Sequence, residues 1–126
     1  MKTIKLFCII LGFFLFSGTM YGQSIAITID DANYVSTDYY TFTGWVVKDM
    51  STFIPTTICL DSPGTLLNYP TDNPGISCGL TKDVTAKIFQ IRIRVKKNNS
   101  VERDGVSALL NSDDFYAGNT PVTVTF

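Results

Sequence analysis

Apolar and polar residues alternate along much of the chain with the period of two that a half-buried β-strand requires. The same alternation near both ends of the chain predicts strands over residues 25–29 and 122–126. Runs rich in aromatic and β-branched residues predict further strands over residues 39–48 and 56–60. The most regular stretch, IFQIRIRVKK at residues 88–97, alternates Phe89, Ile91, Ile93 and Val95 with Gln90, Arg92, Arg94 and Lys96.

Turn-forming residues separate these runs. Clusters of Gly, Pro, Asn, Asp and Ser interrupt the alternation at residues 30–38, 62–64, 73–75, 98–100 and 118–119. Short strands divided by such turns predict an all-β fold, a small antiparallel β-sandwich. We expect at most a turn or two of helix, near residues 107–114. Gly44 interrupts one strand and is a candidate β-bulge.

The first 22 residues have the character of an export signal. Lysines in residues 1–5 precede an apolar run, residues 6–16, and small polar residues follow it at 17–22. The run is shorter than the ~20 residues that span a membrane. We therefore predict a signal peptide over residues 1–22, with Thr19 as a second cleavage position, and one domain over residues 23–126. The mature protein is expected in the periplasm, at the cell surface or outside the cell, without a membrane span.

Two cysteines, Cys59 and Cys78, remain after the predicted leader, because Cys8 belongs to it. In an oxidising compartment an even number of cysteines usually pairs, so we predict a Cys59–Cys78 disulfide. Their spacing and the absence of histidine do not favour a metal or redox site. Immunoglobulin domains place a tryptophan between the bridged cysteines, whereas Trp45 precedes both, so only a general immunoglobulin-like architecture is expected.

Charge limits the classes of partner. Two of the 10 basic residues, Lys2 and Lys5, lie in the leader, which leaves eight against 11 acids and a net charge of −3. Nucleic-acid binding requires an excess of cations, so a nucleic-acid partner is not expected. No cofactor is indicated by any motif.

Arg92, Arg94 and Lys96 share one face of the strand over residues 88–97. A three-residue loop, residues 98–100, would form a hairpin that places Lys96 opposite Glu102 and Arg94 opposite Asp104. A two-residue loop would instead bring like charges together. The three cations therefore form either a solvated face balanced by acids or a site for an anionic ligand.

The apolar residues that follow Asp104 do not fit a regular continuation of this hairpin. Val106, Ala108 and Leu110 share the parity of the two acids. We therefore expect a bulge at Gly105, which would turn the later apolar side chains inward.

Acidic residues supply two weaker hypotheses. Oxygen ligands in the segment DDANYVSTD could hold calcium, although turn and capping roles are commoner for these residue types: Asp30, Asp31, Asn33 and Asp38. Asp113 and Asp114 are adjacent, and neighbouring residues on a strand point to opposite faces. They are therefore a poor pair for sugar hydrolysis, and we expect no enzymatic activity.

The segment over residues 61–80 contains three prolines and three glycines. A disulfide at its base would make it a rigid loop, and rigid loops are good recognition elements. Its apolar residues Leu66, Leu67 and Tyr69 could bind a partner or could fold back over one end of the sandwich.

The sequence thus predicts an exported module that binds or assembles through protein contacts. A carbohydrate-binding module is the first alternative, because aromatic rings can stack on sugars. The rings available for such a platform belong to Tyr34, Tyr39, Tyr40, Trp45, Tyr69 and Tyr116. A small carboxylate-based hydrolase is the second alternative.

Overall fold

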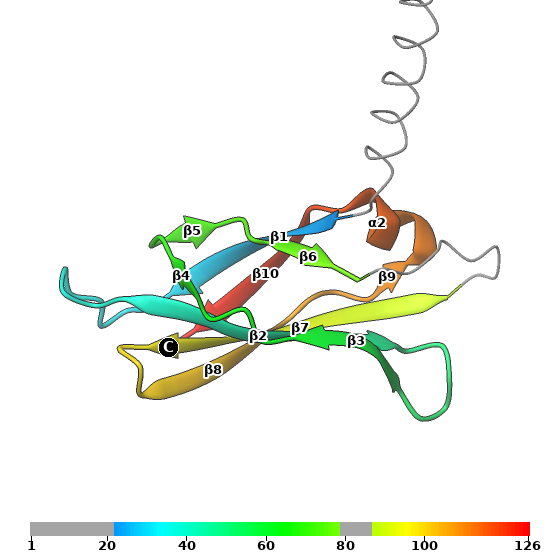
Figure 1. The fold of residues 1–126 in the computed structure, drawn as a ribbon, viewed down its shortest axis with the longest axis horizontal. Helices are drawn as coiled ribbons and strands as arrows, with labels where there is room; N and C mark the ends of the chain where they lie inside the picture. Colours follow the sequence, from blue (N-terminus) through cyan, green and yellow to red (C-terminus); the bar gives the residue numbers. More distant parts are fainter. Residues whose placement is uncertain (1–21, 79–86) are drawn as a thin grey trace, which may run out of the picture.

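Two packed sheets and one short helix make up the described part of the computed structural model, residues 22–78 and 87–126 (Figure 1). The predicted β-sandwich is confirmed, and the predicted leader lies outside the described residues except for Gly22. In chain order the elements are β1 (Gly22–Asp30), β2 (Tyr40–Asp49), β3 (Thr56–Asp61), β4 (Thr65–Leu67), β5 (Thr71–Asp72), β6 (Gly75–Ser77), β7 (Ile88–Lys97), β8 (Val101–Val106), β9 (Leu110–Asn111), α2 (Ser112–Ala117) and β10 (Thr120–Thr125).

The larger sheet has the order β3-β2-β7-β8, with β4 beside β2 and β9 beside β7. The smaller sheet has the order β10-β1-β5, with β6 also beside β1. Strand β10 runs parallel to β1, whereas the other described strand pairs are antiparallel. The first and last strands of the sandwich are therefore neighbours, although they are distant in sequence.

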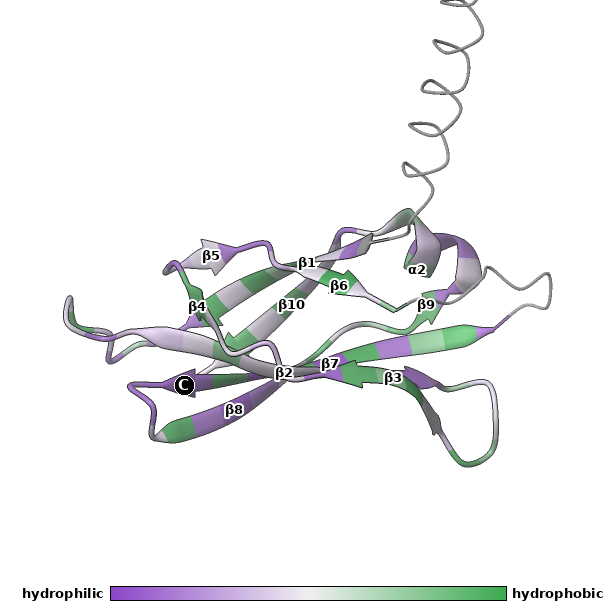
Figure 2. Cartoon of the chain, viewed as in Figure 1, coloured by the Kyte–Doolittle hydropathy of each residue, from purple (hydrophilic) through white to green (hydrophobic). Residues whose placement is uncertain are grey.

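The alternation of residue types places one face of each long strand in the core, as the striped hydropathy of β1 and β7 shows (Figure 2). At the C-terminus, Val122 and Val124 are buried as predicted, and Phe126 is partly buried. The backbone N–H of Phe126 donates a 2.9 Å hydrogen bond to the carbonyl of Asp30. Pro121 needs no ladder partner for its missing N–H, because β10 is an edge strand.

A bulge interrupts β2, as predicted at Gly44. The register with β7 shifts between Phe42 and Gly44. Tyr40 and Phe42 face the core before the shift, and Trp45 and Val47 face it afterwards. One extra residue thus keeps apolar side chains inward along a strand whose sequence changes parity.

The β7–β8 hairpin has the predicted three-residue loop. Lys97 pairs with Val101, Lys96 with Glu102, and Arg94 with Asp104. The predicted bulge at Gly105 is wrong, because the register stays regular through Gly105 and Val106.

Strand β8 ends at Val106, and no extra residue is inserted before its end. The N–H of Ser107 donates to the carbonyl of Ile91 at 2.8 Å, and Val106 stays exposed. No bulge is needed, because the apolar residues that it was expected to turn inward are not buried: Ala108 is also exposed and Leu110 is only half-buried.

The helix α2 closes one end of the sandwich. Asn111 caps its N-terminus by accepting a 2.8 Å hydrogen bond from the N–H of Asp114. Phe115 is buried and its ring stacks on Phe89, with 4.3 Å between ring centroids. The helix overlaps only the end of the region where the sequence predicted one.

The Cys59–Cys78 disulfide is confirmed, with 5.9 Å between the Cα atoms. Cys59 lies in β3 of the larger sheet, and Cys78 directly follows β6 of the smaller sheet. The bridge therefore joins the two sheets covalently at one edge.

Removing this bridge should lower stability strongly. Closure of a loop of this length contributes ~3 kcal/mol in chain-entropy terms. We expect Cys59→Ser combined with Cys78→Ser to lower the melting temperature by more than ~10 °C. Alkylation followed by intact-mass measurement should find no free thiol at Cys59 or Cys78 in the wild-type protein purified without reductant, and two alkylated thiols would contradict the bridge.

Gly105 allows β10 to approach β8 closely. A methyl group added there would lie 2.7 Å from the carbonyl oxygen of Thr123 and 2.8 Å from a methyl group of Val122. We expect Gly105→Ala to destabilise the fold by about 1–3 kcal/mol, measured by denaturant unfolding. Gly75→Ala is the matched control, because an added methyl meets nothing within 4 Å. Equal effects of the two substitutions would contradict the close packing.

Candidate functional site

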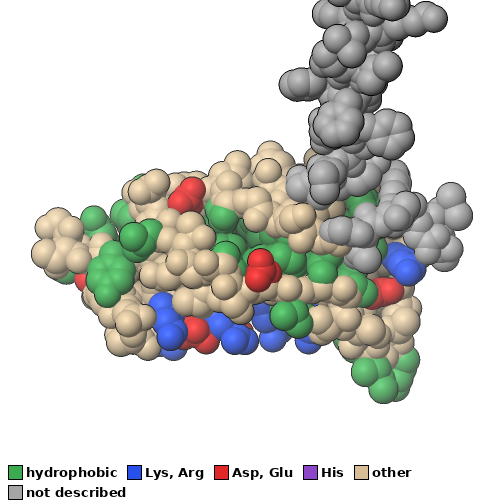
Figure 3. Space-filling view, viewed as in Figure 1, with side chains coloured by type: hydrophobic (Ala, Val, Ile, Leu, Met, Phe, Trp, Pro, Cys, Tyr) green, Lys and Arg blue, Asp and Glu red, His purple; other side chains and the backbone are tan. Residues whose placement is uncertain are grey.

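The predicted cationic row lies on the outer face of the larger sheet, away from the smaller sheet. Arg92 and Arg94 are exposed and Lys96 is half-buried. Figure 3 shows cations and acids interspersed along this side of the molecule. The row is therefore a mixed-charge surface rather than a continuous positive one.

The neighbouring acidic residues form ion pairs with only part of this cationic row. The Nε atom of Arg94 lies 3.3 Å from a carboxylate oxygen of Glu102 and 3.3 Å from one of Asp104. The predicted contact between Arg94 and Asp104 is confirmed. Glu102 lies opposite Lys96 as predicted, but its carboxylate contacts Arg94, so the predicted ion pair between Lys96 and Glu102 is wrong. Within the described residues, Arg92 makes no ion pair.

A groove of about 250 Å³ crosses the outer face at the bulge of β2, and we refer to it as the bulge groove. Gly44 leaves its floor without a side chain. The end of β3 forms one wall and the charged residues of β7 and β8 form the other. The residues around it are Thr43, Gly44, Trp45, Val46, Leu60, Asp61, Ser62, Arg92, Ile93, Arg94 and Glu102.

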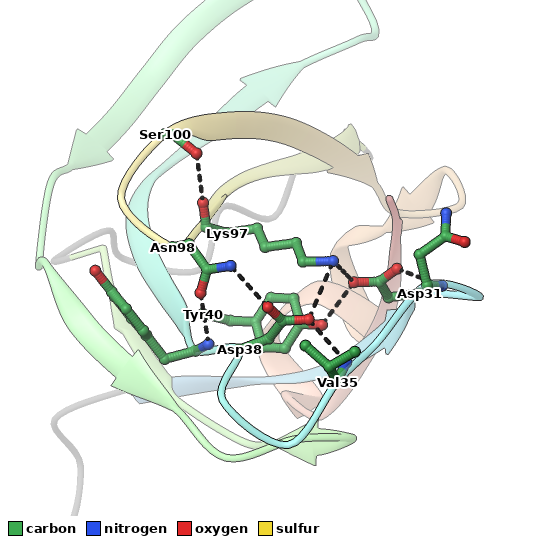
Figure 4. A network of polar contacts seen from close by, with 9 residues as sticks. Asp31, Val35, Asp38, Tyr40, Lys97, Asn98 and Ser100 are labelled. Atoms are coloured by element: carbon green, nitrogen blue, oxygen red, sulfur yellow. Dashed lines mark hydrogen bonds and ion pairs between the residues drawn. The ribbon is translucent and has the colours of Figure 1, made fainter.

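The predicted calcium ligands lie in a network that already contains a cation (Figure 4). The ammonium group of Lys97 hydrogen-bonds to Asp31 and lies 3.3 Å from a carboxylate oxygen of Asp38. The Tyr40 hydroxyl donates to Asp31 at 2.7 Å, and the Asn98 amide donates to Asp38 at 2.7 Å. Lys97 thus occupies the position between two carboxylates that a metal ion would need.

The other two calcium candidates are outside this arrangement. Asn33 contributes only its backbone N–H, which donates to Asp31 at 3.0 Å, and the Asp30 side chain is exposed. Among the described residues, no group of three or more His, Cys, Asp or Glu side chains is placed to bind a metal. The sequence could not show this network, because Lys97 lies 66 residues from Asp31.

Hydrogen bonds set the ionisation of this network. The bond from Lys97, followed by the bond from Tyr40, lowers the pKa of Asp31 below its ordinary value of 3.8. The bond from Asn98 lowers the pKa of Asp38. The hydrogen bond to Asp31 raises the pKa of Lys97 above 10.5, and burial raises the pKa of Tyr40. The charged forms of all three ion-pair members are therefore favoured.

The segment over residues 61–80, described as far as Cys78, is not the single long loop that the sequence predicted. Its residues form β4, β5 and β6, which cross from the larger sheet to the smaller one. Leu67 is buried in the core and Leu66 is 66% exposed. The Tyr69 ring stacks with Tyr34, at 4.2 Å between centroids, and with Tyr40, at 5.8 Å. The three predicted binding residues therefore have three different environments.

The remaining predicted residues are dispersed. Trp45 is buried on the core side, Tyr116 packs edge-on against Phe115, and Tyr39 is exposed. Asp113 and Asp114 lie in the first turn of α2, where acidic side chains stabilise a helix. The aromatic set does not form one surface.

The most exposed apolar group in the described residues is one that the sequence reasoning missed. Phe53 is 103% exposed and Ile54 is 75% exposed, in the turn between β2 and β3. Figure 3 shows an apolar protrusion where Figure 1 places this turn. We refer to Phe53 and Ile54 as the apolar tip. An apolar pair beside Pro55, between two strands, was visible in the sequence, but its exposure was not.

The apolar tip adjoins an open sheet edge. Among the described residues, strand β3 pairs only with β2, and Leu60 on β3 is 67% exposed. An unpaired strand edge presents backbone N–H and C=O groups to which another chain can bond.

Comparison with protein families, curated proteins and solved structures finds no match to this chain. Within residues 22–78 and 87–126, no helix has the length and hydropathy of a membrane span.

The ion-pair network should make stability sensitive to acid. Because the pKa values of Asp31 and Asp38 are lowered in the folded state, their contribution is present above about pH 4 and lost as pH falls through the folded values, below 3.8. We expect the melting temperature of Asp31→Asn to be lower at neutral pH and to fall less steeply below pH 3.8 than that of the wild type.

Asp30→Asn is the matched control, because the carboxylate of Asp30 is exposed and lies outside the network. Parallel melting-temperature profiles for the wild type and Asp31→Asn would contradict the role of the network.

Proposed function

We propose that this protein is an exported, non-catalytic module that binds or assembles through protein–protein contacts. The observation that carries the proposal is the apolar tip, Phe53 and Ile54, beside the open edge of β3. Single exposed apolar residues are ordinary, but a fully exposed phenylalanine beside an isoleucine that is 75% exposed forms a larger apolar group, which supports an interaction site.

Physical chemistry favours a protein partner at this position. A phenylalanine can bury 150–250 Å² on binding, which at roughly 25 cal/mol per Å² makes it an effective anchor. The neighbouring edge of β3 can supply directional backbone hydrogen bonds to the same partner. An anchor combined with a strand edge is a recurring arrangement in peptide and protein recognition.

The arrangement of the aromatic rings supports the carbohydrate alternative less well. A sugar platform needs open ring faces, but the Tyr69 ring stacks with both Tyr34 and Tyr40. The groove that could hold a sugar is formed around Trp45, whose side chain is buried on the core side. For the hydrolase alternative, two acids line the groove, Asp61 and Glu102, and Glu102 is already paired with Arg94.

A capture experiment tests this function. Tagged exported protein should retain a protein from the native cell envelope, and Phe53→Ser with Ile54→Ser should weaken that retention at least tenfold, the loss expected when an interface anchor is removed. Leu109→Ser is the matched control, because Leu109 is 61% exposed and lies away from the β2–β3 turn. Unchanged retention by the double variant, with the fold intact, would refute the role of the apolar tip.

A further inference from the structure

We propose that the partner includes a second copy of this chain, with the apolar tip of one copy inserted into the bulge groove of the next. This inference rests on the proposed function and specifies its partner. The chain carries both halves of the contact: a fully exposed phenylalanine and, elsewhere on its surface, a groove with an exposed leucine in its wall.

The dimensions of the groove fit a side chain better than a free ligand. Its volume of about 250 Å³ is below the ~300–1,000 Å³ of pockets that enclose a drug-sized molecule. One or two inserted side chains, such as Phe53 with Ile54, are the matching occupant.

The chemistry of the walls also fits. Leu60 and Val46 offer apolar contact on one side, and both line the groove. Arg92 lies on the other side and has no ion pair among the described residues. A guanidinium group is attracted to the face of an aromatic ring, so Arg92 can contact Phe53 without first breaking an ion pair.

A single copy cannot make this contact with itself. The tip precedes β3 and the groove lies beside Asp61 and Ser62, where β3 ends. The six residues of β3 separate them by roughly 20 Å of extended strand. The contact is therefore between copies and joins two different surfaces, so each added copy leaves one tip and one groove unoccupied. Such contacts produce open chains or closed rings.

The proposed contact is weak, because it buries only a small area. One inserted tip buries less than the ~1,200–2,000 Å² of stable complexes. Assembly therefore depends on a high local concentration, as on a surface or when the copies are held together. Assembly that depends on local concentration suits a surface-assembly module. It should also appear in solution as an average mass that rises with protein concentration.

Sedimentation velocity of the exported protein over a concentration series tests the proposal. The average mass of the wild type should rise with concentration up to millimolar protein. Phe53→Ser and Leu60→Glu should each raise the apparent dissociation constant at least tenfold. Leu66→Glu is the matched control: Leu66 is 66% exposed and Leu60 is 67% exposed, but Leu66 does not line the groove.

Mixing the two variants gives the decisive result. Phe53→Ser keeps a groove and Leu60→Glu keeps a tip, so the mixture should form a dimer and nothing larger. A mixture that stays monomeric at concentrations where the wild type associates overturns the proposed contact, as does wild-type behaviour of both variants. A wild type that remains monomeric throughout, but captures an envelope protein in a Phe53-dependent manner, overturns self-assembly and leaves the proposed function standing.

Discussion

The antiparallel ladder between β2 and β7 is the interaction on which the rest of the structure depends. It runs from Tyr40 opposite Lys97 to Asp49 opposite Phe89. Every other described strand of the larger sheet pairs with one of these two strands: β3 and β4 with β2, and β8 and β9 with β7. Their inward side chains also supply much of the core against which the smaller sheet packs.

Different interactions hold the two ends of this ladder in place. At one end Lys97 reaches back to Asp31 and Asp38, which ties the β7–β8 hairpin to the β1–β2 connection. At the other end Phe115 of α2 stacks on Phe89. Titrating groups lie at both ends, because Asp49, opposite Phe89, lies 3.9 Å from the ammonium group of Lys87, and hydrogen bonds from Ser51 lower the pKa of Asp49.

The bulge of β2 connects the architecture to the candidate site. It lets a strand of changing parity keep its apolar side chains inward. It also divides the free edge of β2, so β3 pairs with residues 45–49 and β4 with residues 40–42. The chain loops away between them, and the groove is the space that this division leaves around Gly44. Packing of the core and the formation of the groove therefore have one cause.

Strands, the hairpin register and the disulfide could be predicted from the sequence because each depends on a local signal. Alternation identified β1, β7 and β10, and charge pairing selected the loop before Val101. The error at Gly105 has a non-local cause. Its neighbours in β8 do not decide the packing there, because β10 lies against the glycine. The Lys97 network and the parallel pairing of β1 with β10 were inaccessible for the same reason.

Core packing requires the bulge of β2, but it does not require the exposure of the apolar tip. The β2–β3 turn could close with polar residues at no cost to the core, since neither Phe53 nor Ile54 is buried. The bulge, by contrast, is needed to keep Trp45 and Val47 inside. The groove is thus a by-product of folding, whereas the tip contributes nothing to the folded monomer. Exposed apolar area that does not stabilise its own domain is the observation on which the proposed contact with another molecule rests.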